Sequence, residues 1–143
     1  MSIRIRCLRL ADYPSVIELL DLVGLHPRVR GRESRTAFAK QLRSNRTLYL
    51  GAFEGGRLVG TVLGTHDTRK GWINRLSVHP DYRRRGIARR LVRACERGFR
   101  SLGIGVFAAL IEPENEGSLD FFRKLGYQDT DIVYVRRKIR DDV

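Results

Sequence analysis

The chain has 143 residues, of which 42% are hydrophobic and 31% are charged, and its formal net charge is +12. A chain of this length and composition is expected to fold as one domain, residues 1–143, with a sizeable hydrophobic core. No apolar stretch approaches the roughly 20 residues that cross a bilayer, and the N-terminal residues show no signal-peptide core. We therefore expect neither a membrane protein nor a secreted one, and the cytoplasm is the predicted location.

The cysteines and the basic residues restrict the chemistry further. Cys7 and Cys95 are the two cysteines, and we expect both to be buried, reduced thiols. Because the chain has no Cys-x-x-Cys and no His pair at ligand spacing, no metal site is predicted. Lysine occurs only at positions 40, 70, 124 and 138, so arginine supplies most of the charge. Phosphate recognition and genome base composition both explain that arginine content, and the two explanations stay open.

The first half of the chain predicts strands and two helices. Charged and apolar residues alternate near the N-terminus, as in a half-buried strand. Asp12 is expected to cap a helix that tolerates Pro14 in its first turn, and Glu54–Arg57 reads as a hairpin turn. The predicted elements are a strand at 3–8, a helix after Asp12, a short helix at 34–43, and strands at 47–53, 58–66 and 72–78.

The second half contains the clearest helix, residues 86–102. Its apolar residues recur every three or four positions, and its arginines fall on the opposite side, which we interpret as a solvated face. Residues 106–111 are almost continuously apolar, which predicts a strand buried on both sides. Asn115 begins a last helix that Gly126 ends, and residues 127–139 supply one or two final strands. This order predicts an α/β fold: about four helices and a mixed, mostly antiparallel sheet of six to seven strands.

The run from Val78 to Ala88 is the most informative part of the chain. A strand ends, a Pro turn follows, and three arginines lead to Gly86, where the long helix opens. The start of a helix presents unpaired backbone N–H groups and the positive end of the helix dipole. Small residues there let a ligand approach closely. The run therefore predicts an anion site suited to a pyrophosphate.

This run also resembles the acyl-CoA signature of the GCN5-related N-acetyltransferase (GNAT) family. In that family the residue at Arg83 is Arg or Gln, the residue at Gly86 is a fixed glycine, and Ala88 is Gly or Ala. The segment from Asn115 to Tyr127 is similar to the family's Asn-x-x-Ala-x-x-(Phe/Leu)-Tyr-x-x-x-Gly-Phe segment. The two motifs have the family's order and separation, and the resemblance is strongest over residues 46–135.

The resemblance implies acetyl transfer from acetyl-CoA, as co-substrate, to an amine. It further implies that the strands part near the CoA site, so that the edge of one strand holds the pantetheine arm. The CoA-binding residues that it implies are Leu76, Ser77, Val78, Arg83, Arg84, Arg85, Gly86, Ile87, Ala88, Asn115 and Phe122.

The chain departs from the family at the positions of the catalytic acid and base. The usual acid is a Tyr at the position of Phe122. Bases found in the family correspond to Asn74 and Leu110. Possible substitutes come from several elements, namely His66, Asp67, Ser77, Glu112 and Tyr134, but none of them is assigned a catalytic role. The catalytic residues are therefore left unknown.

Three functions from different classes follow. The leading one is an N-acetyltransferase that acts on a primary amine by direct transfer. The alternative is a CoA-binding regulatory module without turnover. Nucleic-acid binding through the arginine face comes last, because aromatic residues do not interleave with that face. Four arginines between residues 25 and 35 hint at an acidic acceptor, although a solvated basic loop explains them too. An exposed final strand would allow a homodimer.

Overall fold

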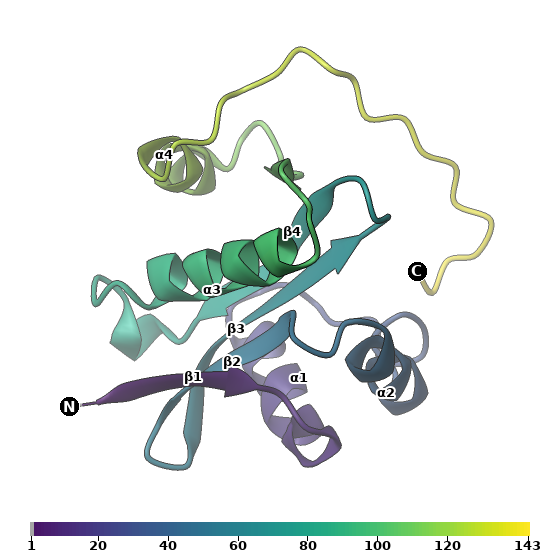
Figure 1. Cartoon of the computed structure of the whole chain (residues 1–143). Coiled ribbons are helices and arrows are strands. Elements are labelled where there is room, and N and C mark those ends of the chain that lie inside the picture. The colour runs from purple at the N-terminus through teal and green to yellow at the C-terminus, as the bar shows by residue number, and fades with distance from the viewer. Residues whose placement is uncertain (1) are drawn as a thin grey trace.

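A five-stranded sheet organises residues 2–143, the part of the chain that this computed structural model describes (Figure 1). The strands lie in chain order across the sheet, β1-β2-β3-β4-β5. They are β1 (Ile3–Cys7), β2 (Tyr49–Glu54), β3 (Arg57–His66), β4 (Gly71–Val78) and β5 (Phe107–Ala109). The α-helices are α1 (Tyr13–Leu22), α2 (Arg35–Ser44), α3 (Ile87–Ser101) and α4 (Glu116–Lys124), and short 3-10 turns cover Leu10–Asp12 and Pro80–Tyr82.

The sheet is mixed and mostly antiparallel, as predicted. Strands β1 to β4 pair antiparallel with their neighbours, and β5 joins β4 in parallel after the crossover through α3. The parallel pairing covers only Gly71–Ile73 on β4 and Phe107–Ala109 on β5. Strand β4 continues to Val78 without β5 beside it. The two strands therefore part over the C-terminal half of β4, which confirms the expected opening.

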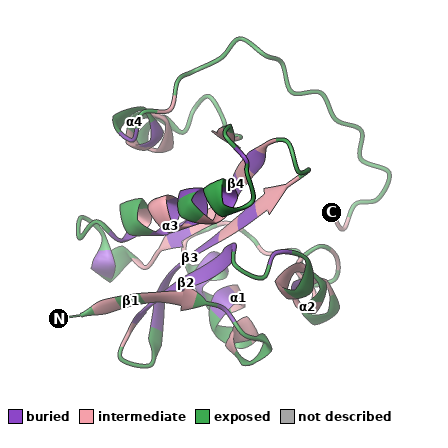
Figure 2. Cartoon of the chain, in the orientation of Figure 1, coloured by how far each residue is buried: buried purple, intermediate pink, exposed green. Residues whose placement is uncertain are grey.

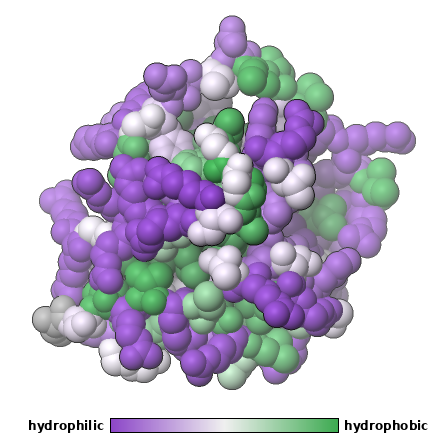
Figure 3. Space-filling model, in the orientation of Figure 1, coloured by the Kyte–Doolittle hydropathy of each residue, from purple (hydrophilic) through white to green (hydrophobic). Residues whose placement is uncertain are grey.

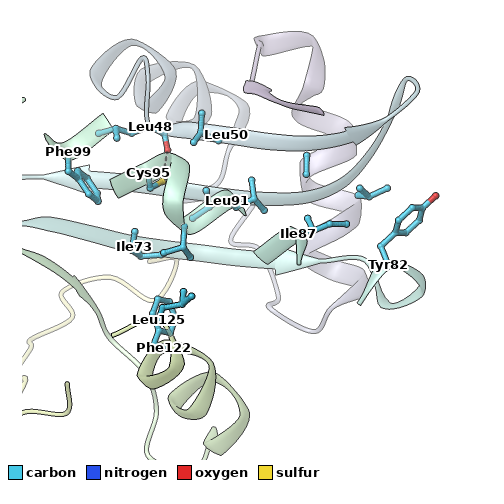
Figure 4. Packing of buried hydrophobic residues seen from close by; sticks show 14 of the residues in the cluster. Leu48, Leu50, Ile73, Tyr82, Ile87, Leu91, Cys95, Phe99, Phe122 and Leu125 are labelled. Atoms are coloured by element: carbon cyan, nitrogen blue, oxygen red, sulfur yellow. Dashed lines mark hydrogen bonds between the residues drawn. The ribbon is translucent and has the colours of Figure 1, made fainter. Parts of the chain in front are cut away.

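Helices cover both faces of the sheet, and each face has its own core. Helix α3 buries Leu91, Cys95 and Phe99 against one face, in a cluster that also includes Phe122 of α4 (Figure 4). Helices α1 and α2 cover the other face, with Leu20 and other apolar residues packed over β2 and β3. Buried residues line the sheet side of α3 while its outer side is exposed, and the surface over α3 is largely hydrophilic (Figures 2 and 3). Arg89, Arg90, Arg97 and Arg100 are therefore exposed, as predicted, whereas Arg93 is half-buried and pairs with the buried carboxylate of Glu96.

Local chemistry explains where the helices begin and end. Ser34 caps α2 by accepting a hydrogen bond from the amide of Ala37 at 3.1 Å. Gly126, with φ of +97°, follows the end of α4, as expected from the sequence. Asp12 precedes α1 but does not cap it through its side chain. Its carboxylate instead accepts from the amide of Arg9 at 2.7 Å and from the guanidinium of Arg6 at 2.8 Å.

Besides the cap expected at Asp12, three further expectations differ from the structure, two in the region after α3 and one on β1. The sheet has five strands instead of six to seven, because residues 128–139 run outside it and leave Ile132, Val135 and other apolar residues exposed (Figure 2). β-branched residues favour a strand, but a strand forms only where an edge pairs with it. The predicted buried strand at 106–111 shortens to β5. Val106 is 53% and Leu110 is 59% exposed, so the apolar run was not a sign of burial on both sides.

Cys7 is the third difference, since it is exposed and not buried. It lies on β1, the edge strand of the sheet, where alternate side chains face solvent. Cys95 is buried as expected. No helix within residues 2–143 is both long and apolar enough to cross a membrane.

Candidate functional site

A β-bulge in β4 lies where β4 and β5 part. The β3–β4 register shifts between Leu63↔Asn74 and Thr61↔Ser77. Arg75, in this shift, has φ of +53°, a left-handed conformation that is uncommon for a residue other than glycine. A bulge of this kind bends and twists its strand. It accounts for the departure of β4 from β5.

A cavity of about 580 Å³ occupies the gap that results. One part of its wall comes from the α1 and α2 side of the sheet, including Tyr13, Phe38 and Tyr49. Another part comes from the start of α4 and from Phe122, which belongs to the core on the other side. The cavity therefore passes through the sheet and joins its two sides.

The start of α3 has the geometry of an anion site. Arg84 and Gly86 adopt left-handed backbones, with φ of +64° and +74°. In residues 2–143, the backbone N–H groups of the first helical turn, Ile87 to Arg89, make no hydrogen bond to the protein. A Cβ on Gly86 would meet no atom within 4 Å, so the backbone conformation and the open space, not a packing contact, favour glycine. The loop thus points free donors at solvent.

Tyr82 fixes this loop to the body of the protein. Its hydroxyl donates to a carboxylate oxygen of Glu54 at 2.8 Å, and its ring is buried. The guanidinium of Arg85 lies 4.9 Å from the centre of that ring. This distance is within the range of a cation–π contact. The arginine-rich loop is consequently exposed but anchored.

The structure brings only some of the predicted CoA residues together. Leu76, Asn115 and Phe122 line the cavity. Ser77 is buried and donates to the carbonyl of Arg75 at 3.2 Å, while Val78 packs against the core beside α3. The arginine loop, with Ala88 and the buried side chain of Ile87, follows β4 beyond the cavity wall. The predicted set thus divides into a cavity part and a helix-start part, joined by β4.

Asn115 and Asn74 already have structural roles. The side chain of Asn115 caps α4 by accepting from the amide of Ser118 at 3.1 Å. The amide group of Asn74 donates to the carbonyl of Leu63 at 3.1 Å, to Thr65 Oγ1 at 3.0 Å and to the carbonyl of Trp72 at 3.2 Å. Asn74 therefore ties β3 to β4 at the edge of the opening. Leu110, also in the cavity wall, offers no group that could carry a proton.

A polar network on the α1 and α2 side was missed from the sequence. The carboxylate of Glu33 pairs with the guanidinium of Arg75, which also donates to the carbonyl of Leu25 at 3.3 Å. The hydroxyl of Tyr13 donates to the backbone carbonyl of Glu33 at 2.6 Å. The network fastens the loop after α1 to the bulge in β4. One sign was available: Glu33 is the sole acidic residue among the arginines of 28–35.

Burial shapes the acid–base properties of the tyrosine next to this network. Tyr49 is only 5% exposed, and desolvation raises the pKa of its hydroxyl above the usual range. The charge of Glu33 raises that pKa further, while Arg75 lowers it. The hydroxyl is consequently protonated at every physiological pH.

The fold and the site define a class of α/β proteins in which a mixed sheet opens beside a bulged strand, and a helix start with free backbone N–H groups follows that strand. The chain belongs to the acetyltransferase (GNAT) family, whose profile matches residues 13–127. An acetyltransferase of Pectobacterium atrosepticum is 28% identical over 139 residues, which cover 96% of each chain.

Solved structures share the fold. The PaiA N-acetyltransferase of Thermoplasma acidophilum, in complex with coenzyme A, has a TM-score of 0.83 at 23% identity, covering 93% of this chain and 94% of that one. AAC(6')-Iy in complex with the bisubstrate analogue CoA-S-monomethyl-acetylneamine has a TM-score of 0.78 at 21% identity, covering 96% and 99%. At these identities the likeness establishes the fold alone.

Proposed function

We propose that this protein is an N-acetyltransferase that moves an acetyl group from acetyl-CoA to a primary amine by direct transfer. The observation that carries the proposal is the cavity that passes through the gap between β4 and β5. An amine entering from the α1 and α2 side would meet a thioester lying in that gap. The GNAT fold, and a structure of the same fold solved with coenzyme A, support this choice of co-substrate.

The residues present fit coenzyme A. The free N–H groups at the start of α3 would hold the pyrophosphate, helped by the exposed side chains of Arg83, Arg84 and Arg85. The unpaired edge of β4 over Leu76 to Val78 would bind the pantetheine arm as an added strand. Asn115 and Phe122 would close the cavity from α4. Bound acetyl-CoA would supply the activated acetyl group.

The unbonded backbone of β4 also has a chemical role in this proposal. Backbone N–H groups held beside the gap would stabilise negative charge that develops on the acetyl oxygen. The amine must lose its proton before it attacks, because an unperturbed amine of the lysine type has a pKa of about 10.4. Neither Cys7 nor Cys95 lines the cavity, and Cys95 is buried, with its pKa raised to about 12 by that burial. These observations support direct transfer without an acetyl-cysteine intermediate.

A second function has one observation in its favour. The positions where relatives in the family carry an acid or a base hold Asn74, Leu110 and Phe122, and none of these side chains can exchange a proton at neutral pH. A CoA-binding regulatory module without turnover would need no such group. A cytoplasmic location is part of both proposals.

Calorimetric titration with acetyl-CoA tests the cofactor. We expect micromolar binding to the wild type and no binding to Gly86→Glu, because a carboxylate at the helix start repels phosphate. Gly103→Glu is the matched control: Gly103 has φ of +80°, follows the other end of α3, and has equally open space around its Cβ position. Equal loss of acetyl-CoA binding in both variants would show that backbone strain, not the carboxylate at the helix start, causes the loss. A wild type that does not bind acetyl-CoA would contradict the proposed co-substrate.

Turnover is tested separately by an amine panel. Acetyl-CoA is incubated with the protein and with amines, amino acids, polyamines and peptides, and the release of free CoA thiol is measured. We expect release with at least one amine and none with Gly86→Glu. Tight binding of acetyl-CoA without release on any amine would favour the regulatory module instead.

A further inference from the structure

The half of the cavity under α1 and α2 contains a tyrosine hydroxyl that has no hydrogen-bond partner in the protein. Tyr49 is 5% exposed and packs against Phe38, with ring centres 5.1 Å apart. Within residues 2–143 its hydroxyl makes no hydrogen bond, and the oxygen is not one of the fully buried unpaired atoms, so it is open to the cavity that Tyr49 lines. The hydroxyl of a residue with so little exposed surface normally has a partner, because an unmade hydrogen bond costs stability. The cavity is where such a partner would bind.

Glu33 adds an unpaired carboxylate oxygen to the same wall. Its side chain is 10% exposed, and Oε1 accepts from the amide of Arg28 at 2.9 Å and from the guanidinium of Arg75. Its second oxygen, Oε2, is buried and accepts no hydrogen bond within residues 2–143. Glu33 and Tyr49 both line this cavity, on the side that α1 and α2 cover. A ligand in that half of the cavity can therefore contact both.

The other charged groups around the cavity leave these two oxygen acceptors available to a cation. Arg75 is the half-buried arginine of the wall, and both of its terminal nitrogens are already bonded, to Glu33 and to Leu25. Arg32 and Arg136 are exposed, and so is the carboxylate of Glu112. The aromatic rings of Tyr13, Phe38 and Tyr49 complete the inner wall. Unused oxygen acceptors beside aromatic rings suit a cation with N–H donors.

We infer that this half of the cavity binds an ammonium group of the acceptor, and that the acceptor is a small amine with at least two amino groups. One amino group, held as the ammonium, would donate to Glu33 Oε2 and to the hydroxyl oxygen of Tyr49. The other would reach the gap between β4 and β5 as the group to be acetylated. The role of the second amino group as the acetylated group rests on the proposed function. Binding of the ammonium group near Glu33 and Tyr49 does not depend on turnover.

The test measures amine binding by calorimetry, using the full chain with and without CoA, so that no acetyl transfer takes place. The probes are 1,4-diaminobutane, the matched diol 1,4-butanediol, which carries no ammonium group, and L-glutamate as an amine that carries carboxylates. We expect the diamine to bind about tenfold more tightly than the diol, in the range of one charge-assisted hydrogen bond. Equal binding of the diamine and the diol, or tightest binding of L-glutamate, would overturn the inference. L-glutamate stands for the acidic acceptor that the arginines of residues 25–35 suggest.

Two variants locate the effect. Tyr49→Phe removes only the unpaired hydroxyl, so we expect about fivefold to tenfold weaker diamine binding with no loss of Tm. Glu33→Gln should bring the diamine down to the affinity of the diol, and Glu18→Gln, at an exposed position outside the cavity wall, is the control that should leave the preference intact. If Glu33→Gln fails to fold, Tyr49→Phe decides alone: unchanged diamine binding in that variant would refute the site.

The titration with CoA separates the two proposals. CoA binding without a preference for the diamine overturns this inference and leaves the cofactor proposal standing. A preference for the diamine in a protein that does not bind CoA would support the amine site and end the proposed acetyl transfer.

Discussion

Helices α3 and α4 flank the opening of the sheet, but they are held in different ways. Helix α3 has 15 residues, and six of them are buried, among them Leu91, Cys95 and Phe99. Helix α4 has nine residues, of which only Phe122 is buried, with Leu125 just beyond its end (Figure 4). One side of the opening is thus part of the core, and the other is attached to it at a few points.

The attachment of α4 depends on a buried carboxylate in α3. Glu96 is 2% exposed; it accepts from the hydroxyl of Tyr127 at 2.7 Å and from the guanidinium of Arg93 at 2.7 Å. Arg93 also donates to the carbonyl of Leu125 at 3.1 Å. The network joins the C-terminal end of α4 to α3, while the N-terminal end, with Asn115, borders the cavity. A helix fixed at one end can move at the other without disturbing the core.

The largest effect is expected from removing the centre of the α3 core. Phe99 is fully buried, and its ring lies so close to β4 that a Cβ on Gly71 would stand 2.7 Å from it. Phe99→Ala should lower the free energy of unfolding by about 3–5 kcal/mol, measured by urea denaturation. Leu102→Ala, at the C-cap position that follows the same helix and is 52% exposed, should change it by less than about 0.5 kcal/mol. A small loss at Phe99 would contradict the view that α3 is the fixed side.

A smaller and local effect is expected at the attachment of α4. Tyr127→Phe leaves an oxygen of buried Glu96 without a donor, and we expect a loss of about 1–3 kcal/mol. Amide hydrogen exchange should become faster in residues 116–126 and stay unchanged in α3. In the background of Glu96→Gln the same substitution should cost less, because the charged acceptor is gone. Equal acceleration in both helices would show that α4 and α3 open as one unit.

The sequence predicted the α3 side of the site better than the α4 side, and the reason is physical. The helix pattern of residues 86–102 and the glycine of the helix start depend on local conformation, which the sequence encodes directly. The predicted final strand would have needed a strand to pair with. Residues 128–139 have no such partner within the described chain, despite their β-branched residues.

The network of Tyr13, Glu33 and Arg75 was missed for a related reason. These residues come from a helix, a loop and a strand that only the folded protein brings together, so no spacing in the sequence relates them. Tyr49 looks like any strand aromatic until its burial and its unpaired hydroxyl are known.

The smallest expected effect is measured by labelling the two cysteines, which reports whether α3 opens together with α4 and does not itself destabilise either helix. Burial raises the pKa of Cys95 in α3 to about 12, and its thiol lies 3.6 Å from the carbonyl of Leu48, whereas Cys7 is exposed on β1. At pH 8 burial keeps the Cys95 thiol protonated and out of reach of the reagent, so a thiol-specific aromatic disulfide should label one cysteine in the native protein and two in denaturant. Native Cys7→Ser should therefore show no labelling.

Tyr127→Phe should leave Cys95 unreactive, because α3 stays closed when α4 loosens, and Phe99→Ala should make it reactive. Labelling of Cys95 in Tyr127→Phe would mean that the helix assigned to the core opens together with the helix attached to it.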